Sequence, residues 1–214
     1  MQEMNVESFS IGSVYYKNED RIVVQEIEKY GITAVLADGM GGLSLGDVAA
    51  EVVAKSVADY ITNNYQGFDE IDILHGALEY ADRELRKVSI AHRSNMGTAV
   101  AVAIVSGCHL YCTWQGNVRI YVFHDGEKWL VSEDHIANIG YGRTALTRCI
   151  KGAGLRDDIP FKCLELEEGN KVYLCTDGLY NVADSILGKV SIDKLKSMLT
   201  SPEDDASVIE IKIR

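Results

Sequence analysis

The stretch Gly31-Ile32-Thr33-Ala34-Val35-Leu36-Ala37 runs directly into Asp38-Gly39-Met40-Gly41-Gly42, so an apolar, β-branched segment ends in an acidic, glycine-rich turn. The first part predicts a β-strand over Gly31–Ala37. The chain repeats the arrangement at Tyr173-Leu174-Cys175-Thr176-Asp177-Gly178. In both places an aspartate ends the strand, and the glycine after it lets the backbone approach an ion closely because it has no Cβ. We therefore expect the two turns to serve one site.

The segments around this strand predict an α+β fold. Val6–Ile11 and Arg21–Ile27 read as strands that precede Gly31–Ala37 in a run of consecutive antiparallel strands. Two helices follow, because apolar residues recur at helical spacing from Val48 to Ile61 and from Ile71 to Val88. Turn residues then separate the four strands of a predicted meander: Thr98–Val105, His109–Gln115, Arg119–His124 and Lys128–Val131.

The last third of the chain alternates between irregular and regular segments. Asp134–Ile150 shows no clear period and predicts a flap. Strands are expected at Phe161–Leu166, Val172–Cys175 and Ser207–Ile213, and a short helix at Ser191–Leu199. Strands grouped with strands and helices with helices indicate two antiparallel sheets covered by helices, not an alternating parallel fold. No repeat or linker divides the chain, so we expect one domain over residues 1–214.

The acidic composition excludes several classes of protein. The chain has 32 Asp and Glu against 21 Lys and Arg, a net charge of −11. This charge would repel a phosphate backbone, so we expect no nucleic-acid partner. The apolar runs are far shorter than the roughly 20 residues of a membrane span, so we expect no membrane partner. Five cysteines without a C-x-x-C pair favour a reducing compartment, and we expect a cytoplasmic monomer.

Acidic residues gather at the ends of predicted strands. The four places are Asn18-Glu19-Asp20, Asp38, Asp177 and Asp204-Asp205. Each one alone is more commonly a turn than a ligand, because Asp-Gly is a frequent turn dipeptide. Together they would form an anion cluster that needs cations, since close like charges raise one another's pKa. Mg²⁺ and Mn²⁺ prefer such oxygen ligands, so the pattern predicts a site for these ions.

The order of the motifs along nearly the whole chain resembles the bacterial PPM-type, or protein phosphatase 2C-like, metal-dependent Ser/Thr phosphatases. The motifs are Asn18-Glu19-Asp20, Ala37 to Gly42, Met96-Gly97-Thr98, Gly116-Asn117-Val118-Arg119, Leu146-Thr147-Arg148, Thr176-Asp177-Gly178-Leu179 and Asp204 to Val208. The resemblance implies a four-layer α-β-β-α sandwich, in which two antiparallel sheets lie between helix pairs. This agrees with the element order read from the sequence alone.

The resemblance also implies a role for each acidic residue. Asp38 would bridge two Mn²⁺ or Mg²⁺ ions. Glu19 and the carbonyl of Gly39 would complete one ion's protein ligands, and Asp177 with Asp204 would hold the other. Asp20 would hydrogen-bond a metal-bound water. Two such ions lower the pKa of a bridging water and orient it for in-line attack on phosphorus, so no covalent enzyme intermediate is needed.

The chain departs from the family's pattern at several positions. Tyr15 stands where the family usually has an arginine that holds the substrate phosphate, and Lys17 is either a compensating cation or an exposed loop lysine. Asn117 replaces an aspartate implicated in a third metal site, or simply suits a turn. Asp205 replaces the usual asparagine. Met40, which is ordinary among bacterial members, stands where some relatives have a proton-donating histidine.

These observations favour one function over its alternatives. The sequence has neither the C-x₅-R loop of cysteine-dependent phosphatases nor a phosphate-binding glycine-rich motif. The resemblance implies a protein phosphatase that acts on phosphoserine and phosphothreonine in proteins. The alternative is a catalytically weakened module that binds a signalling partner, as the missing arginine suggests. The complete set of metal carboxylates argues against the alternative, because a scaffold could replace them with apolar residues.

Overall fold

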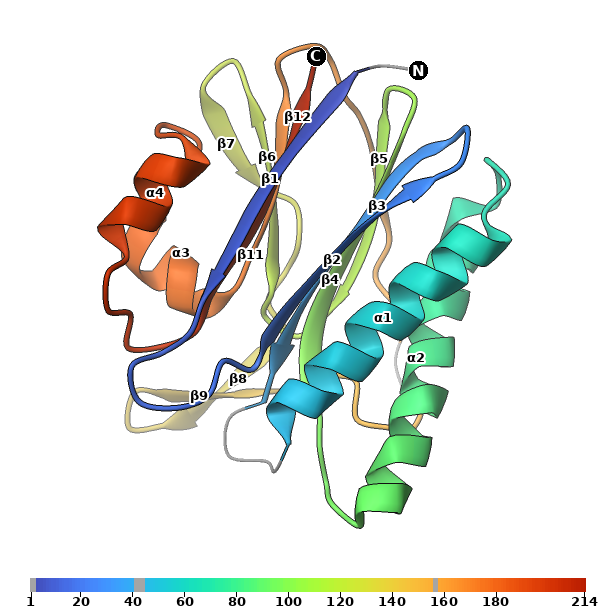
Figure 1. Ribbon diagram of the computed structural model, residues 1–214, viewed down its shortest axis with the longest axis vertical. Helices are drawn as coiled ribbons and strands as arrows, with labels where there is room; N and C mark the ends of the chain where they lie inside the picture. The colour runs from blue at the N-terminus through green and yellow to red at the C-terminus, as the bar shows by residue number, and fades with distance from the viewer. Residues whose placement is uncertain (1–2, 41–44, 156–157) are drawn as a thin grey trace.

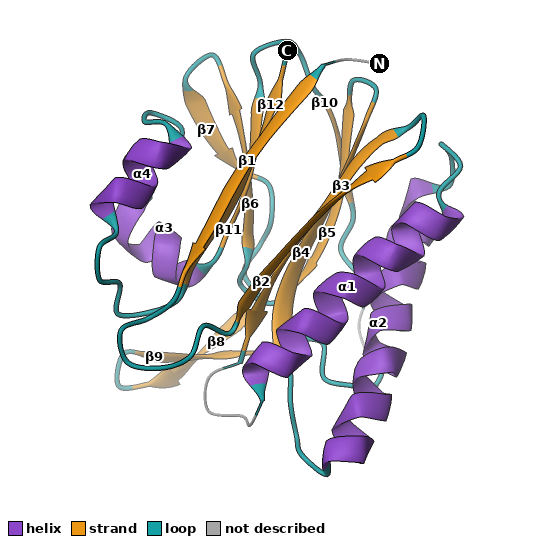
Figure 2. Ribbon diagram, viewed as in Figure 1, coloured by secondary structure: helices purple, strands orange, loops and turns teal. Residues whose placement is uncertain are grey.

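The computed structural model describes residues 3–40, 45–155 and 158–214. It consists of two five-stranded antiparallel sheets packed face to face, with a pair of helices on the outer side of each (Figures 1 and 2). The predicted α+β sandwich is therefore confirmed. Among the described residues, no helix combines the length and the apolar character that a membrane crossing requires.

The first sheet joins strands from both ends of the chain. In spatial order its strands are β1 (Met4–Ile11), β12 (Ala206–Ile213), β11 (Lys171–Cys175), β6 (Arg119–His124) and β7 (Glu127–Leu130). Two short helices, α3 (Asp177–Ala183) and α4 (Ile192–Met198), cover its outer face.

The second sheet holds the stretch with which the sequence analysis began. Its order is β10 (Lys162–Glu165), β5 (His109–Gln115), β4 (Thr98–Ser106), β3 (Gly31–Gly39) and β2 (Asp20–Ile27). The longer helices α1 (Gly46–Asn64) and α2 (Glu70–His92) cover its outer face. A separate hairpin of β8 (Ile136–Gly140) and β9 (Arg143–Leu146) crosses below both sheets (Figure 1).

Side-chain alternation along the central strands produces the layers. In β3, Val35 and Ala37 pack under the helices, whereas Ala34 and Leu36 face the other sheet. This follows from the period of two along a strand, which sends successive side chains to opposite faces. Both faces of β3 are covered, which explains why its sequence is an unbroken apolar run rather than an alternating one.

Two expectations about strand pairing were wrong. β1 does not pair with β2 but lies antiparallel to β12 at the edge of the other sheet. The predicted meander is also divided, because β4 and β5 belong to one sheet and β6 and β7 to the other. Strand-forming patterns do not encode which sheet a strand joins. Among the connections that carry the chain from one sheet to the other are the loops Gly12 to Glu19 and Gly116 to Val118.

Two regular elements were missed. The stretch Asp134–Ile150 contains the β8–β9 hairpin, whose two strands are almost entirely exposed. Exposed strands lack the apolar alternation from which a strand is recognised. Helix α3 begins at Asp177 itself and has only seven residues, so it is too short to show a helical period.

Candidate metal centre

The acidic strand ends meet in one cavity at the edge where the two sheets come together. The cavity has a volume of about 480 Å³. The predicted metal ligands all line it, together with Asp205: Glu19, Asp38, Gly39, Asp177 and Asp204. They come from the loop before β2, the end of β3, the start of α3 and the segment before β12. Residues more than 180 positions apart are therefore neighbours here because β1 and β12 pair.

Strand register places the first two acidic groups. Asp20 is the first residue of β2 and lies directly opposite Asp38 at the end of β3. Thr98 of β4 donates its hydroxyl to the Asp38 carbonyl at 2.7 Å, which fixes the end of the strand. Thr176 donates its hydroxyl to Asp20 Oδ2 at 3.0 Å. Thr176 directly follows β11 of the opposite sheet, so both sheets contribute to one site.

Glycine allows the backbone to approach at two points of this site. A Cβ on Gly39 would lie 2.5 Å from the Gly46 carbonyl oxygen and 2.9 Å from Glu19 Cβ. A Cβ on Gly178 would lie 2.2 Å from the Asp205 carbonyl oxygen. Neither gap can hold a side chain, so the glycines after Asp38 and Asp177 are required by packing in addition to any role toward an ion.

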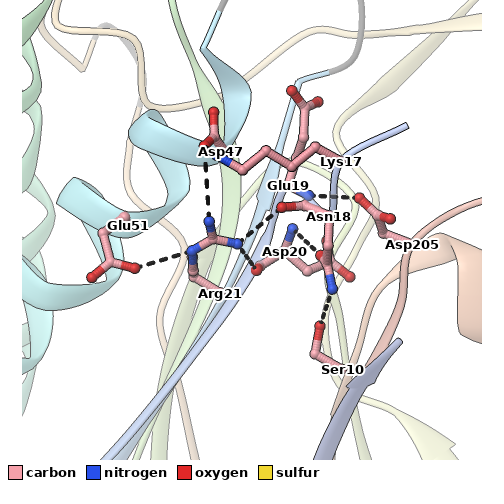
Figure 3. A network of polar contacts seen from close by, with 9 residues as sticks. All are labelled: Ser10, Lys17, Asn18, Glu19, Asp20, Arg21, Asp47, Glu51 and Asp205. Carbon is pink, nitrogen blue, oxygen red and sulfur yellow. Dashed lines mark hydrogen bonds and ion pairs between the residues drawn. The ribbon is translucent and has the colours of Figure 1, made fainter. Parts of the chain in front are cut away.

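Asp205 holds the loop that carries Glu19. Its Oδ1 accepts a hydrogen bond from the Ser13 backbone N–H and its Oδ2 one from the Glu19 backbone N–H, both at 2.7 Å. A carboxylate can accept at both oxygens, whereas an asparagine could accept at only one. The aspartate at this position, which departs from the family pattern, therefore has a structural reason: it positions Glu19 (Figure 3).

Two residues whose role the sequence did not reveal also position acidic groups. Asn117 donates its side-chain amide to Asp177 Oδ2 at 3.0 Å. The Tyr16 hydroxyl donates a hydrogen bond to Asp204 Oδ1. From the sequence, Asn117 is expected to be a turn residue or a replaced metal ligand. No local pattern could have revealed either contact, because the partners lie 60 and 188 positions away.

The electrostatics show that the cluster is short of positive charge. Burial raises the pKa of Asp20 to about 8, and the charges of Asp205 and Asp177 add to the effect. Burial, followed by the charges of Asp20 and Asp177, holds the pKa of Asp38 well above its usual value. Burial and the charge of Asp204 likewise raise the pKa of Asp177. In addition, Asp20 Oδ1 is buried with no hydrogen-bond partner among the described residues.

These residues fit hydrated divalent ions. Their donors are carboxylate and carbonyl oxygens, which Mg²⁺ and Mn²⁺ prefer. Among the described residues no three His, Cys, Asp or Glu side chains already converge as a closed ligand set. Mg²⁺ keeps several waters and needs few protein ligands, so a spacious cluster of carboxylates suits such ions better than a closed cage would.

Lys17 lies away from the acidic cavity. Its ammonium forms an ion pair with Asp47 in the first turn of α1, and its side chain is 76% exposed. Arg21 lies beside the same carboxylate and donates from Nε to Glu51 Oε2 at 3.0 Å (Figure 3). Tyr15 is exposed and does not line the cavity. The substrate-binding role that the sequence suggested for Lys17 therefore stays a prediction. A substrate phosphate would have to compete with Asp47 for the Lys17 ammonium.

A second cleft adjoins the acidic cavity and shares Met40 and Leu146 with it. It has a volume of about 610 Å³, and Arg148 and Lys151 contribute positive charge to its wall. One side of this cleft depends on Asp82 of α2, a buried carboxylate that accepts hydrogen bonds from the backbone N–H groups of residues 151, 152 and 154. The signal for Asp82 was present in the sequence: it is a charged residue within the buried stripe of α2.

Comparison with known proteins identifies the family to which the chain belongs. The model of the family described as protein phosphatase 2C matches residues 16–208. The chain belongs to the protein phosphatase 2C family. The chain is 29% identical over 211 residues to a Streptococcus pyogenes protein named protein phosphatase 2C-type. This match covers 86% of this chain and 84% of that protein. It is 27% identical over 161 residues to the serine/threonine protein phosphatase PstP of Mycobacterium tuberculosis, covering 67% of this chain and 31% of the longer PstP.

Solved structures show the same protein phosphatase 2C fold. The crystal structure of the Mycobacterium tuberculosis phosphatase PstP/Ppp superimposes with a TM-score of 0.83 at 21% identity, covering 99% of both chains. The catalytic domain of PstP, solved in complex with two manganese ions, gives a TM-score of 0.78 at 22% identity, covering 98% of both chains. At these identities the likeness shows that the fold is shared, which the two-sheet architecture described above already indicates.

Proposed function

We propose that this chain is a protein phosphatase that hydrolyses phosphoserine and phosphothreonine monoesters with the help of two Mn²⁺ or Mg²⁺ ions. The observation that carries the proposal is the meeting of Glu19, Asp38, Asp177 and Asp204 in one cavity whose buried carboxylates have raised pKa values. Membership of the protein phosphatase 2C family and the two manganese ions reported for PstP support it.

Each residue has a defined task in this proposal. Asp38, at the centre of the cluster, would contact both ions. Glu19 and the Gly39 carbonyl would hold one ion, and Asp177 and Asp204 the other. When bound, the ions supply an acidic water as nucleophile and neutralise charge on the phosphoryl oxygens. Asp20, whose Oδ1 has no hydrogen-bond partner among the described residues, would orient a water by a hydrogen bond.

The described part of the chain indicates how the substrate phosphate would be held. No described lysine or arginine lines the acidic cavity, so the ions would carry most of the phosphate binding. Met40 lines the cavity and cannot donate a proton, so the leaving oxygen would take its proton from water. Arg148 and Lys151 lie in the adjoining cleft, where they can attract a negatively charged substrate over a longer distance.

A weakened module that binds a signalling partner is the second candidate. Tyr15 stands where the family usually has a phosphate-binding arginine, and Lys17 is paired with Asp47, so neither position offers a free cation to a substrate phosphate, which favours this candidate. Retention of all four carboxylates favours the enzyme. A cluster of this kind costs stability unless ions neutralise it, and a binding module has no need of it.

Hydrolysis assays distinguish the two candidates. The protein is incubated with an aryl phosphate and with phosphoserine peptides in Mn²⁺, Mg²⁺ or EDTA, alongside Asp38→Asn and Asp177→Asn. We expect turnover with metal and a loss of at least a hundredfold in EDTA and in either variant, with Glu79→Gln on the exposed face of α2 as the matched control. Full turnover in EDTA would overturn the metal mechanism, and no turnover with either metal would favour the binding module.

The cellular setting belongs to the same proposal. We infer a cytoplasmic, monomeric enzyme with a single domain over residues 1–214 that acts on phosphorylated proteins and has neither nucleic-acid nor membrane partners. All five cysteines are free thiols, in keeping with a reducing compartment. The net charge of −11 supports the expected absence of a nucleic-acid partner.

A further inference from the structure

A third hollow adjoins the acidic cavity and shares no described lining residue with the Arg148 cleft. We call it the α3–α4 groove. Its volume is about 700 Å³, and it lies between α3 and the segment from Met198 to Asp204. Tyr16 and Asp204 line both the groove and the acidic cavity, so the two hollows lie next to each other. Figure 1 shows this segment descending from α4 to the loop between β1 and β2.

The lining of the groove is mixed, and its apolar part includes two exposed side chains. Val182 is 67% exposed and Met198 52%, and Leu199 and Pro202 complete the apolar lining. Gly178, Asn181 and Val182 follow one another at helical spacing, so α3 presents one continuous face to the groove. Among the described lining residues there is no lysine or arginine, while Glu203 and Asp204 are acidic. The apolar part of the lining therefore suits an apolar side chain, and the two carboxylates repel an acidic one.

The distance from the proposed metal site fixes which substrate residue could reach the groove. Helix α3 begins at the proposed ligand Asp177, and Val182 lies five residues further on, which is about 7.5 Å along the helix axis. An extended peptide advances about 3.3 Å per residue, so this length corresponds to about two residues. Side chains two residues apart also point to the same side of an extended peptide.

We propose that the α3–α4 groove binds an apolar side chain of the phosphoprotein substrate, two residues away from the phosphorylated residue. This inference rests on the proposed phosphatase function and adds a selectivity to it. The occupant is a substrate side chain, because the groove borders the acidic cavity at Tyr16 and Asp204. A peptide whose phosphate lies in that cavity must pass over one of its rims.

The test uses phosphoserine peptides with Leu, Ala, Asp or Lys two residues before or two residues after the phosphoserine. In one of the two series we expect kcat/KM for the Leu peptide to exceed that for the Ala peptide by about three- to tenfold, with the Asp peptide lowest. In the double variant Val182→Ser, Met198→Ser we expect the Leu/Ala ratio to fall to near one. Ile90→Ser on α2 is the matched control, since Ile90 is equally exposed and distant, and it should keep the wild-type ratio.

Each other result overturns the inference. These results are a wild-type Leu/Ala ratio near one in both series, a preference for Lys, or a preference that persists in the double variant. Self-association that is lost in the double variant, measured by sedimentation, would assign the groove to a second copy of the chain. Because ratios are compared within each protein, a general loss of turnover does not affect them. If the chain hydrolyses nothing, fluorescence anisotropy of the same labelled peptides in Mn²⁺ still measures the Leu/Ala ratio, so failure of the proposed function and failure of the groove remain distinguishable.

Discussion

Asp82 gives the sharpest test of how α2 supports the cleft next to the acidic cavity. Its carboxylate is 5% exposed and accepts backbone hydrogen bonds from Gly152 at 2.7 Å, Gly154 at 2.8 Å and Lys151 at 3.3 Å. Asp82→Ala removes both acceptor oxygens and with them all three hydrogen bonds to one loop. The same loop provides the Lys151 wall of the cleft, so loss of the hydrogen bonds should loosen that wall.

The expected cost follows from these distances. The two shorter bonds involve an ionised acceptor and are worth about 1.5–3 kcal/mol each, while the long third bond adds little. Lys151 and Gly154 are exposed, so water recovers part of the loss once the loop opens. We expect Asp82→Ala to lower the free energy of unfolding by about 2–4 kcal/mol. Asp82→Asn keeps one acceptor oxygen and should cost about half as much.

Urea unfolding in the presence of Mn²⁺ measures the cost, and amide hydrogen exchange locates it. Glu79→Ala, on the exposed face of the same helix, is the control and should stay within about 0.5 kcal/mol of the wild type. The Gly152 and Gly154 amides should exchange faster only in the Asp82 variants. If Asp82→Ala unfolds within 0.5 kcal/mol of the wild type and these amides stay protected, the carboxylate does not hold the loop and the reasoning fails.

Three further predictions concern the acidic cavity. In EDTA the free energy of unfolding should fall as pH rises from about 4 to about 8, because the raised pKa of Asp20 makes the folded chain bind more protons than the unfolded chain. Urea unfolding at several pH values measures this. The free energy should change less steeply with pH in Asp20→Asn and in the presence of Mn²⁺. Asn117→Ala removes the amide that holds Asp177, so the Mn²⁺ concentration for half-maximal activity should rise about five- to tenfold, and an unchanged value would contradict that role. Tyr15→Arg should lower KM for phosphopeptides about tenfold, because it adds a guanidinium that can bind the phosphate. Lys17→Ala should change KM less than twofold if the ion pair with Asp47 keeps Lys17 from the phosphate. Steady-state kinetics of both variants test these two expectations.

The pattern of apolar residues predicted most of the regular structure. Strands such as His109–Gln115 and Arg119–His124 have the bounds that their β-branched and aromatic residues indicated. The two long helices also lie where apolar residues recur at helical spacing. Such elements are recognisable because one or both of their faces are buried, and burial imposes a period on the sequence. The exposed β8–β9 hairpin and the seven-residue α3 carry no such period and were missed.

Part of the chemistry of the site could also be predicted from the sequence. The acidic residues at Glu19, Asp38, Asp177 and Asp204 stand out because each ends or precedes an apolar strand, and the structure brings them into one cavity. The residues that hold these acidic groups in place could not be predicted from the sequence. Asp205 binds the Glu19 backbone across 186 positions, and Asn117 binds Asp177 across 60. Hydrogen bonds between residues so far apart in the sequence leave no local pattern.

By itself, the sequence determined the kinds of element, their order and the acidic groups that end the strands, because these depend on local periodicity and on the chemistry of single residues. Only the tertiary structure decided which sheet each strand joins, that β1 lies beside β12, and that Lys17 is paired with Asp47. Strand pairing is chosen by the packing of whole layers, in which a strand with two apolar faces could fit at several places. The ion-pair partner of a long, flexible side chain depends on which charged groups the fold brings near it. The acidic cavity therefore takes its residues from the sequence and its geometry from the pairing of the two ends of the chain.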